Sequence, residues 1–174
     1  FIARSTGAKV LNFSRGGMTA KEYCDTFAEE NGFWSGELLC QAYIIALGVN
    51  DILRINMPLG SISDVVLDNY NKNAQTFAGY YAKIIQRIKA MNPKAKFFLV
   101  TMPKDENADE DIKKSAHAQL MYDFAGTFDN TYVLDLFKYA PKMTADYINK
   151  FCMGGHMSPI GYLISARMIE SYID

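Results

Sequence analysis

The chain has 174 residues, enough for one domain with a sizeable core. Hydrophobic residues make up 49% and charged residues 21%, the ordinary balance of a globular domain. The net charge is −1 with Lys and Arg scattered, and no apolar run reaches the ~20 residues of a membrane span, so neither nucleic acid nor a bilayer is an expected partner.

The first third of the chain predicts a helix end, a strand and a helix. Residues 1–9 (FIARSTGAK) resemble the end of a helix stopped by a glycine. KVLNF at 9–13 is apolar and contains a β-branched residue, which predicts a strand. Thr19 and Glu22 fit a capping box, and the helix that they open is expected to stop near Asn31-Gly32.

The rest of the chain alternates between apolar runs and helical spacing. The apolar runs predict strands at 43–48, 95–101 and 132–137. An apolar stripe over 74–91, closed by Asn92-Pro93, predicts a long helix. Two more helices are expected, one over 112–124 and one from Ser158 and Pro159 to Tyr172.

Strands that are apolar throughout are typical of a sheet covered on both faces, and the intervening helices favour a parallel α/β fold. Ligands in such folds bind beyond the carboxyl ends of the strands. Residues 14–17, 48–51 and 101–104 are expected at those ends. Asn50 and Asp51 therefore fall where a site is expected, although both are also common turn formers.

Two further segments have alternative readings. Gly16-Gly17 fits a turn that needs positive φ, or a loop that cradles phosphate, but neither Gly-x-Gly-x-x-Gly nor a following Lys-Ser/Thr pair is present. Cys152 and His156 are four residues apart, but no second Cys/His pair completes a metal site, so no metal is expected. The other histidine, His117, lies within the predicted 112–124 helix and is expected on its solvated face.

Three segments together resemble a known family. NFSRGGMT, ALGVNDIL and GGHMSPIGY, in this order and at these separations, resemble the SGNH (GDSL-like) hydrolases, over essentially the whole chain. The resemblance implies a flavodoxin-like three-layer α/β/α fold with a parallel sheet, in a single domain over residues 1–174. It also implies a serine esterase that uses no cofactor.

The resemblance assigns roles to five positions. Gly17 and Asn50 map onto the oxyanion-hole donors and His156 onto the general base, with Gly48 and Asp51 supporting the Gly-x-Asn-Asp element. Preorganised N–H donors stabilise the oxyanion of acyl transfer, and imidazole titrates near neutrality, so these residue types suit the reaction.

The chain departs from the family pattern twice. No Gly-Asp-Ser motif occurs, so we expect the nucleophilic serine upstream of Phe1, in roughly 20–30 further residues that carry the central first strand and the start of the first helix. Met153 occupies the position of the Asp that orients the histidine, so His156 needs another orienting group or works in a dyad.

The sequence thus predicts an acetylhydrolase-type esterase that removes a small acyl group, such as an O-acetyl group on a carbohydrate. The alternative is a degenerate or flavodoxin-like module that binds a ligand without turnover. Three cysteines without a Cys-x-x-Cys pair favour a reducing compartment such as the cytoplasm, and no targeting segment is readable.

Overall fold

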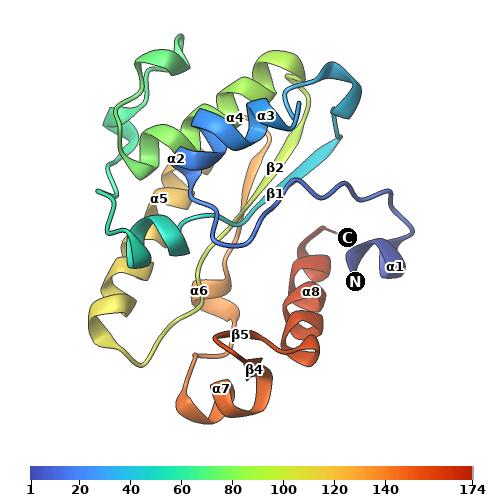
Figure 1. Ribbon diagram of the computed structural model, residues 1–174, viewed down its shortest axis with the longest axis vertical. Coiled ribbons are helices and arrows are strands. Elements are labelled where there is room, and N and C mark those ends of the chain that lie inside the picture. The colour runs from blue at the N-terminus through green and yellow to red at the C-terminus, as the bar shows by residue number, and fades with distance from the viewer. Residues whose placement is uncertain (174) are drawn as a thin grey trace.

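The computed structural model describes residues 1–173 (Figure 1). Helices and strands alternate along it, with several short 3₁₀ and π-helical turns labelled η. The elements are α1 (Ile2–Thr6), α2 (Ala20–Glu22), η1 (Tyr23–Phe27), α3 (Ala28–Glu30), η2 (Gly36–Leu38), β1 (Ala42–Ile45), η3 (Val49–Arg54), η4 (Ile62–Asp64), η5 (Tyr70–Lys72), α4 (Phe77–Met91), β2 (Lys96–Val100), α5 (Ala108–Thr127), β3 (Thr131–Leu134), α6 (Leu136–Tyr139), α7 (Ala145–Phe151), β4 (Cys152–Met153), β5 (His156–Met157) and α8 (Pro159–Ile173).

The centre of the fold is a parallel three-stranded sheet in the order β1-β2-β3. Helix α4 connects β1 to β2, and α5 connects β2 to β3. The fold is therefore of the α/β class, as the sequence predicts. A separate antiparallel pair, β4 and β5, lies with α7 and α8 at one end of the molecule (Figure 1).

Helices cover both faces of this sheet because its strands are apolar on both sides. On one face, Ile45, Phe97 and Leu99 belong to the main core with apolar side chains of α2, α4 and α5. On the other face, Phe98, Val100 and Leu134 form a smaller cluster against Leu136 and Ile169. The strands are therefore held in a buried core. This core fixes the starting positions of the loops that follow the carboxyl ends of the strands.

The predicted helix boundaries are confirmed where a cap was readable. Thr19 Oγ accepts the backbone N–H of Glu22 at 3.1 Å, and the helical run over 20–30 ends at Asn31, followed by Gly32 with φ +65°. Ser158 Oγ accepts the backbone N–H of Gly161 at 3.3 Å, and α8 begins at Pro159. Short polar side chains at these positions bond backbone N–H groups that would otherwise have no partner. This local requirement is why the helix starts could be recognised from the sequence.

The predicted strand at 9–13 is wrong. These residues are irregular, and Val10 is 53% exposed. A strand needs a neighbour to bond its amides and carbonyls, and β1 pairs only with β2 within the described residues. Residues 9–13 are apolar, as a strand would be, but no strand in the described residues pairs with them.

The expectation for His117 is also wrong, because its side chain is fully buried. Ile112, the first residue of the helix predicted over 112–124, is 68% exposed. The buried face of α5 instead runs through His117, Leu120, Met121 and Phe124. His117 precedes these residues by three, four and seven positions, the spacing of one helical face.

Candidate functional site

The Gly-x-Asn-Asp element opens the π-helical turn η3, which is separated from the end of β1 by three residues. The backbone N–H of Ile55 donates to Asn50 O at 3.0 Å, five residues earlier, and the N–H of Met57 donates to Asp51 O at 2.7 Å. Single turns of π-helix are frequent at functional sites. The turn fixes the directions in which Asn50, Asp51 and Arg54 project.

Gly48 allows this turn to begin. Its φ of +128° is unsuited to residues with a side chain, and a Cβ at this position would lie 2.7 Å from His117 Nε2. The imidazole of His117 thus lies directly under the backbone of Gly48. Its Nε2 is 3.1 Å from Leu47 O, and a carbonyl only accepts, so Nε2 carries the proton of the neutral ring.

His117 has a second feature that follows from this burial. Its Nδ1 has no hydrogen-bond partner within the described residues. Burial lowers the pKa of His117 to about 4, against an opposing contribution from the Leu47 carbonyl. The ring is therefore neutral at physiological pH.

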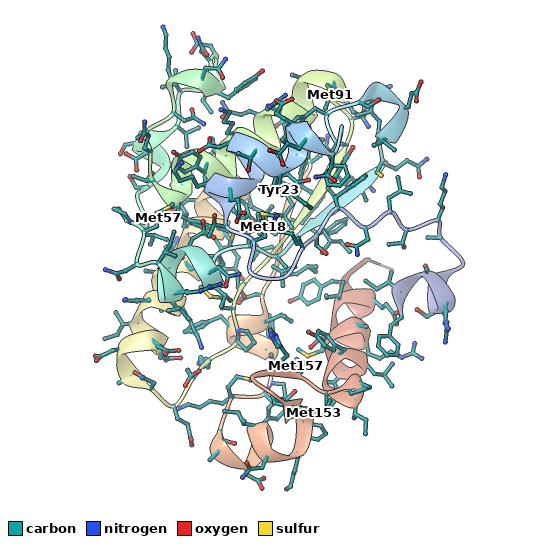
Figure 2. The ribbon with its side chains drawn as sticks, in the orientation of Figure 1. Met18, Tyr23, Met57, Met91, Met153 and Met157 are labelled. Atoms are coloured by element: carbon teal, nitrogen blue, oxygen red, sulfur yellow. The ribbon has the colours of Figure 1, made fainter. Side chains whose placement is uncertain are left out.

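Asn50 and Asp51 join this turn to the loop that contains Gly17. Asn50 Nδ2 donates to Met18 O at 3.0 Å, and Asp51 Oδ1 accepts the N–H of Ala20 at 2.8 Å. Two segments more than 30 residues apart in sequence are thereby held together. Met18 lies near the middle of the molecule in Figure 2.

The two side chains differ in their environment. Asp51 is fully buried, and burial raises the pKa of its carboxyl group despite the backbone N–H groups that it accepts. Its Oδ2 has no partner within the described residues. Asn50 is only partly buried, and its amide has two hydrogens, of which the bond to Met18 uses one.

Arg54, the last residue of η3, also lies next to the loop that contains Gly17. Gly17 has φ +75°, and a Cβ there would lie 3.3 Å from Arg54 Nη1, so the guanidinium is beside Gly17. Arg54 is exposed, as is Gly17. The structure thus brings Gly17, Asn50 and Arg54 together on one accessible surface.

His156 lies apart from these residues. It is in β5, directly opposite Met153 in β4, and Gly154 and Gly155 between them have φ of +59° and +80°. Two consecutive residues with positive φ are typical of a tight type I′ hairpin turn. The Gly-rich segment is therefore a short hairpin.

This hairpin does not contact the Gly17–Asn50 pair through any hydrogen bond within residues 1–173. Met153 and Met157, which flank His156, lie toward the lower end of Figure 2, away from Met18. Both His156 and Met153 are exposed, Met153 by 71%. No carboxylate in the described part of the chain pairs with His156.

The serines near the site have other partners. Ser14 Oγ donates to Asn12 Oδ1 at 2.6 Å, and Ser158 caps α8. Neither hydroxyl is hydrogen-bonded to a histidine in the described residues. Neither therefore has the arrangement of an activated nucleophile.

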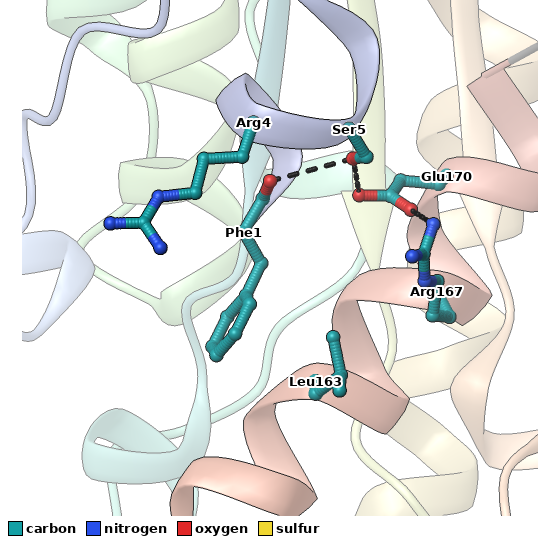
Figure 3. A pocket seen from close by; sticks show the side chains of 6 residues that line it. All are labelled: Phe1, Arg4, Ser5, Leu163, Arg167 and Glu170. Carbon is teal, nitrogen blue, oxygen red and sulfur yellow. Dashed lines mark hydrogen bonds and ion pairs between the residues drawn. The ribbon is translucent and has the colours of Figure 1, made fainter.

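Two hollows lie elsewhere on the molecule. One of about 170 Å³ lies between α1 and α8, where Arg167 Nη1 pairs with Glu170 at 3.0 Å and Ser5 donates to the same carboxylate (Figure 3). Another, of about 280 Å³, lies between α5 and α6 around Tyr122 and Asp135. The Gly17–Asn50 surface lines neither of these two.

Two kinds of feature are absent from residues 1–173. No helix is long and apolar enough to cross a membrane. No group of three or more His, Cys, Asp or Glu side chains is arranged to hold a metal ion.

Comparison with known proteins bears on the fold alone. A crystal structure of an uncharacterised protein superposes on the chain with a TM-score of 0.60 at 23% sequence identity, covering 91% of this chain and 72% of that one. At this identity the match supports the α/β architecture and no activity. No family model matches the chain, and no curated protein gives a significant match.

Two residues of this region were missed from the sequence. His117 could have been recognised, because it shares a helical face with Leu120 and Phe124. Arg54 could not, because an arginine after a turn is usually a solvated surface residue. Arg54 becomes a candidate site residue only because the 14–17 loop packs against η3 in the folded protein.

Proposed function

We propose that the protein is a serine esterase of the SGNH type, which transfers a small acyl group from an ester first to serine and then to water. The observation that carries the proposal is the hydrogen bond from Asn50 Nδ2 to Met18 O, which holds the Asn50 amide beside Gly17. The second amide hydrogen of Asn50 and the backbone N–H of Gly17 are then available for an oxyanion.

The chemistry assigned to these groups is acyl transfer. A serine hydroxyl attacks the ester carbonyl, and the proton of the hydroxyl passes to His156. The tetrahedral oxyanion then accepts hydrogen bonds from the two N–H donors. The C–O bond to the alcohol breaks as His156 returns the proton to the leaving oxygen. Water then repeats the sequence and releases the carboxylic acid. The serine and the role of His156 in this scheme come from the family resemblance.

The expected substrate is a small acyl ester, with O-acetyl groups on carbohydrates as the leading class. Because the surface at Gly17 and Asn50 is open, it suits an acyl group presented on a larger molecule. No cofactor enters the scheme.

A specific observation favours a second candidate, a ligand-binding module without turnover. Met153 faces His156 across the hairpin, and a thioether cannot orient an imidazole as a carboxylate does. In this alternative, the Gly17–Asn50 surface binds a carbonyl or an anion and no covalent step follows.

Labelling with a fluorophosphonate probe separates the two candidates. We expect the full-length protein to gain one adduct by intact mass, at a serine other than Ser14 or Ser158, and to lose its hydrolysis of p-nitrophenyl acetate. His156→Ala should abolish both labelling and turnover, with an unchanged melting temperature because its side chain is exposed.

The esterase proposal fails if neither adduct nor turnover is observed while a reference serine hydrolase reacts under the same conditions. Labelling at Ser14 or Ser158 would also contradict it. In either case the binding module becomes the better account.

A further inference from the structure

We infer that Arg54 is a specificity-determining residue that selects esters carrying a carboxylate close to the scissile carbonyl. This inference rests on the proposed function and names its substrate class. It is carried by the position of the Arg54 guanidinium beside Gly17, one of the two proposed oxyanion donors.

The first argument is placement. Nη1 of Arg54 would lie 3.3 Å from a Cβ on Gly17, so the guanidinium lies against the side of Gly17 from which a side chain would project. A substrate whose carbonyl oxygen binds the Gly17 N–H is then close to this cation. Any carboxylate a few bonds from that carbonyl would then meet Arg54.

The second argument is the absence of a protein partner. Within residues 1–173, Arg15, Arg87 and Arg167 each pair with a glutamate, at 2.6 Å for Arg87–Glu29 and 3.0 Å for Arg167–Glu170, whereas Arg4 and Arg54 do not. Within residues 1–173, no carboxylate lies within ion-pair distance of Arg54. Its planar set of N–H donors, which matches a carboxylate in bidentate fashion, is thus free for a ligand.

The third argument is the fixed backbone under Arg54. The π-helical turn is held by the bond from Ile55 N–H to Asn50 O. It is also held by Lys113 Nζ of α5, which donates to Asn56 Oδ1 at 2.9 Å. Because the backbone that carries Arg54 is already fixed, less conformational entropy is lost when the residue binds a ligand.

The inference is tested with ester pairs matched in size. Mono-p-nitrophenyl succinate carries a carboxylate on the acyl group, and p-nitrophenyl valerate is its neutral counterpart. 4-Acetoxybenzoate and 4-acetoxybenzamide form the equivalent pair for a carboxylate on the leaving group. The quantity compared is the ratio of kcat/KM for the anionic ester to that for the neutral one.

We expect the wild-type ratio to exceed one in at least one pair, and Arg54→Gln to lower that ratio by roughly 10-fold, mainly through KM, as for an exposed charge-assisted bond. The kcat/KM of the neutral esters should fall by a smaller factor, because they carry no carboxylate for the guanidinium to bind. Added salt should reduce the wild-type ratio and leave that of Arg54→Gln unchanged. Arg15→Gln is the matched control, because Arg15 pairs with Glu22 and lies over the Phe27 ring, and it should keep the wild-type ratio.

Each contrary result has a distinct meaning. Hydrolysis of the neutral esters with no anionic preference, or an equal loss on both members of a pair in Arg54→Gln, overturns the role of Arg54 and leaves the esterase proposal standing. No hydrolysis of any ester overturns both.

Discussion

At the scale of single residues, the molecule holds two buried ionisable groups next to its candidate site. His117 lies under Gly48, and Asp51 of η3 accepts the first backbone N–H of α2. Each has one polar atom without a partner in the described residues. Buried polar atoms of this kind cost stability, so these two residues are expected to matter for the geometry of the site.

His117 makes the stability of the protein depend on pH. Its pKa in the folded state is about 4, below the 6.5 of an unperturbed histidine. The unfolded chain therefore binds more protons between these values, and the stability present above pH 6.5 is lost as the pH falls toward 4. The full loss is on the order of 3 kcal/mol.

The measurement is the free energy of urea unfolding of the wild type and of His117→Gln from pH 7.5 to 4. We expect the slope with pH to be markedly smaller in the variant. Asp51, whose pKa is raised, acts in the opposite direction, but it is present in both proteins and cancels in the comparison. His156→Gln, at an exposed position, is the control. Equal slopes in wild type and His117→Gln would contradict a buried neutral His117.

At the scale of elements, the candidate site depends on the joint between η3 and α2. Thr19 satisfies one amide of the first helical turn and Asp51 another, that of Ala20, which is fully buried. The helix start and the Asn50 turn are thus anchored to each other. A change in this joint should affect both stability and the position of Met18.

We predict that Asp51→Ala destabilises the protein by about 1–3 kcal/mol, because it leaves the buried N–H of Ala20 without an acceptor. Asp51→Asn retains an acceptor oxygen and has no charge to desolvate, so it should cost little. Urea unfolding at pH 7 compares the two variants with the wild type. If Asp51→Ala were as stable as Asp51→Asn, the carboxylate would not be the anchor of α2.

At the scale of the whole molecule, the sequence predicted the class of fold but not all of its parts. The three strands of the sheet and the capped helix ends were recognisable, since apolar runs and polar caps act locally. The segment 9–13 was not, because a strand exists only with a neighbour to pair with. The site followed the same division: the Asn50 turn was readable from its motif, whereas the approach of Arg54 to Gly17 depends on tertiary packing.

The hairpin that carries His156 shows the same difference between local and tertiary features. Gly154-Gly155 predicts a turn, and the turn is present as a I′-type hairpin. The relation of that hairpin to the Gly17–Asn50 pair is a property of the whole fold, and no hydrogen bond in the described residues joins them. Activity measurements are therefore the decisive evidence for the esterase proposal.

The most direct measurement is kcat for p-nitrophenyl acetate in Asn50→Ala and Asn50→Asp, with melting temperature as the control for folding. If Asn50 donates to the oxyanion, Asn50→Ala should lower kcat by roughly 10²–10³. Asn50→Asp should lower it at least as much, because it replaces the N–H donor with a negative acceptor of nearly the same shape. Activity near that of the wild type in Asn50→Asp, with a loss only in Asn50→Ala, would show that Asn50 serves as a turn residue and would contradict the oxyanion hole.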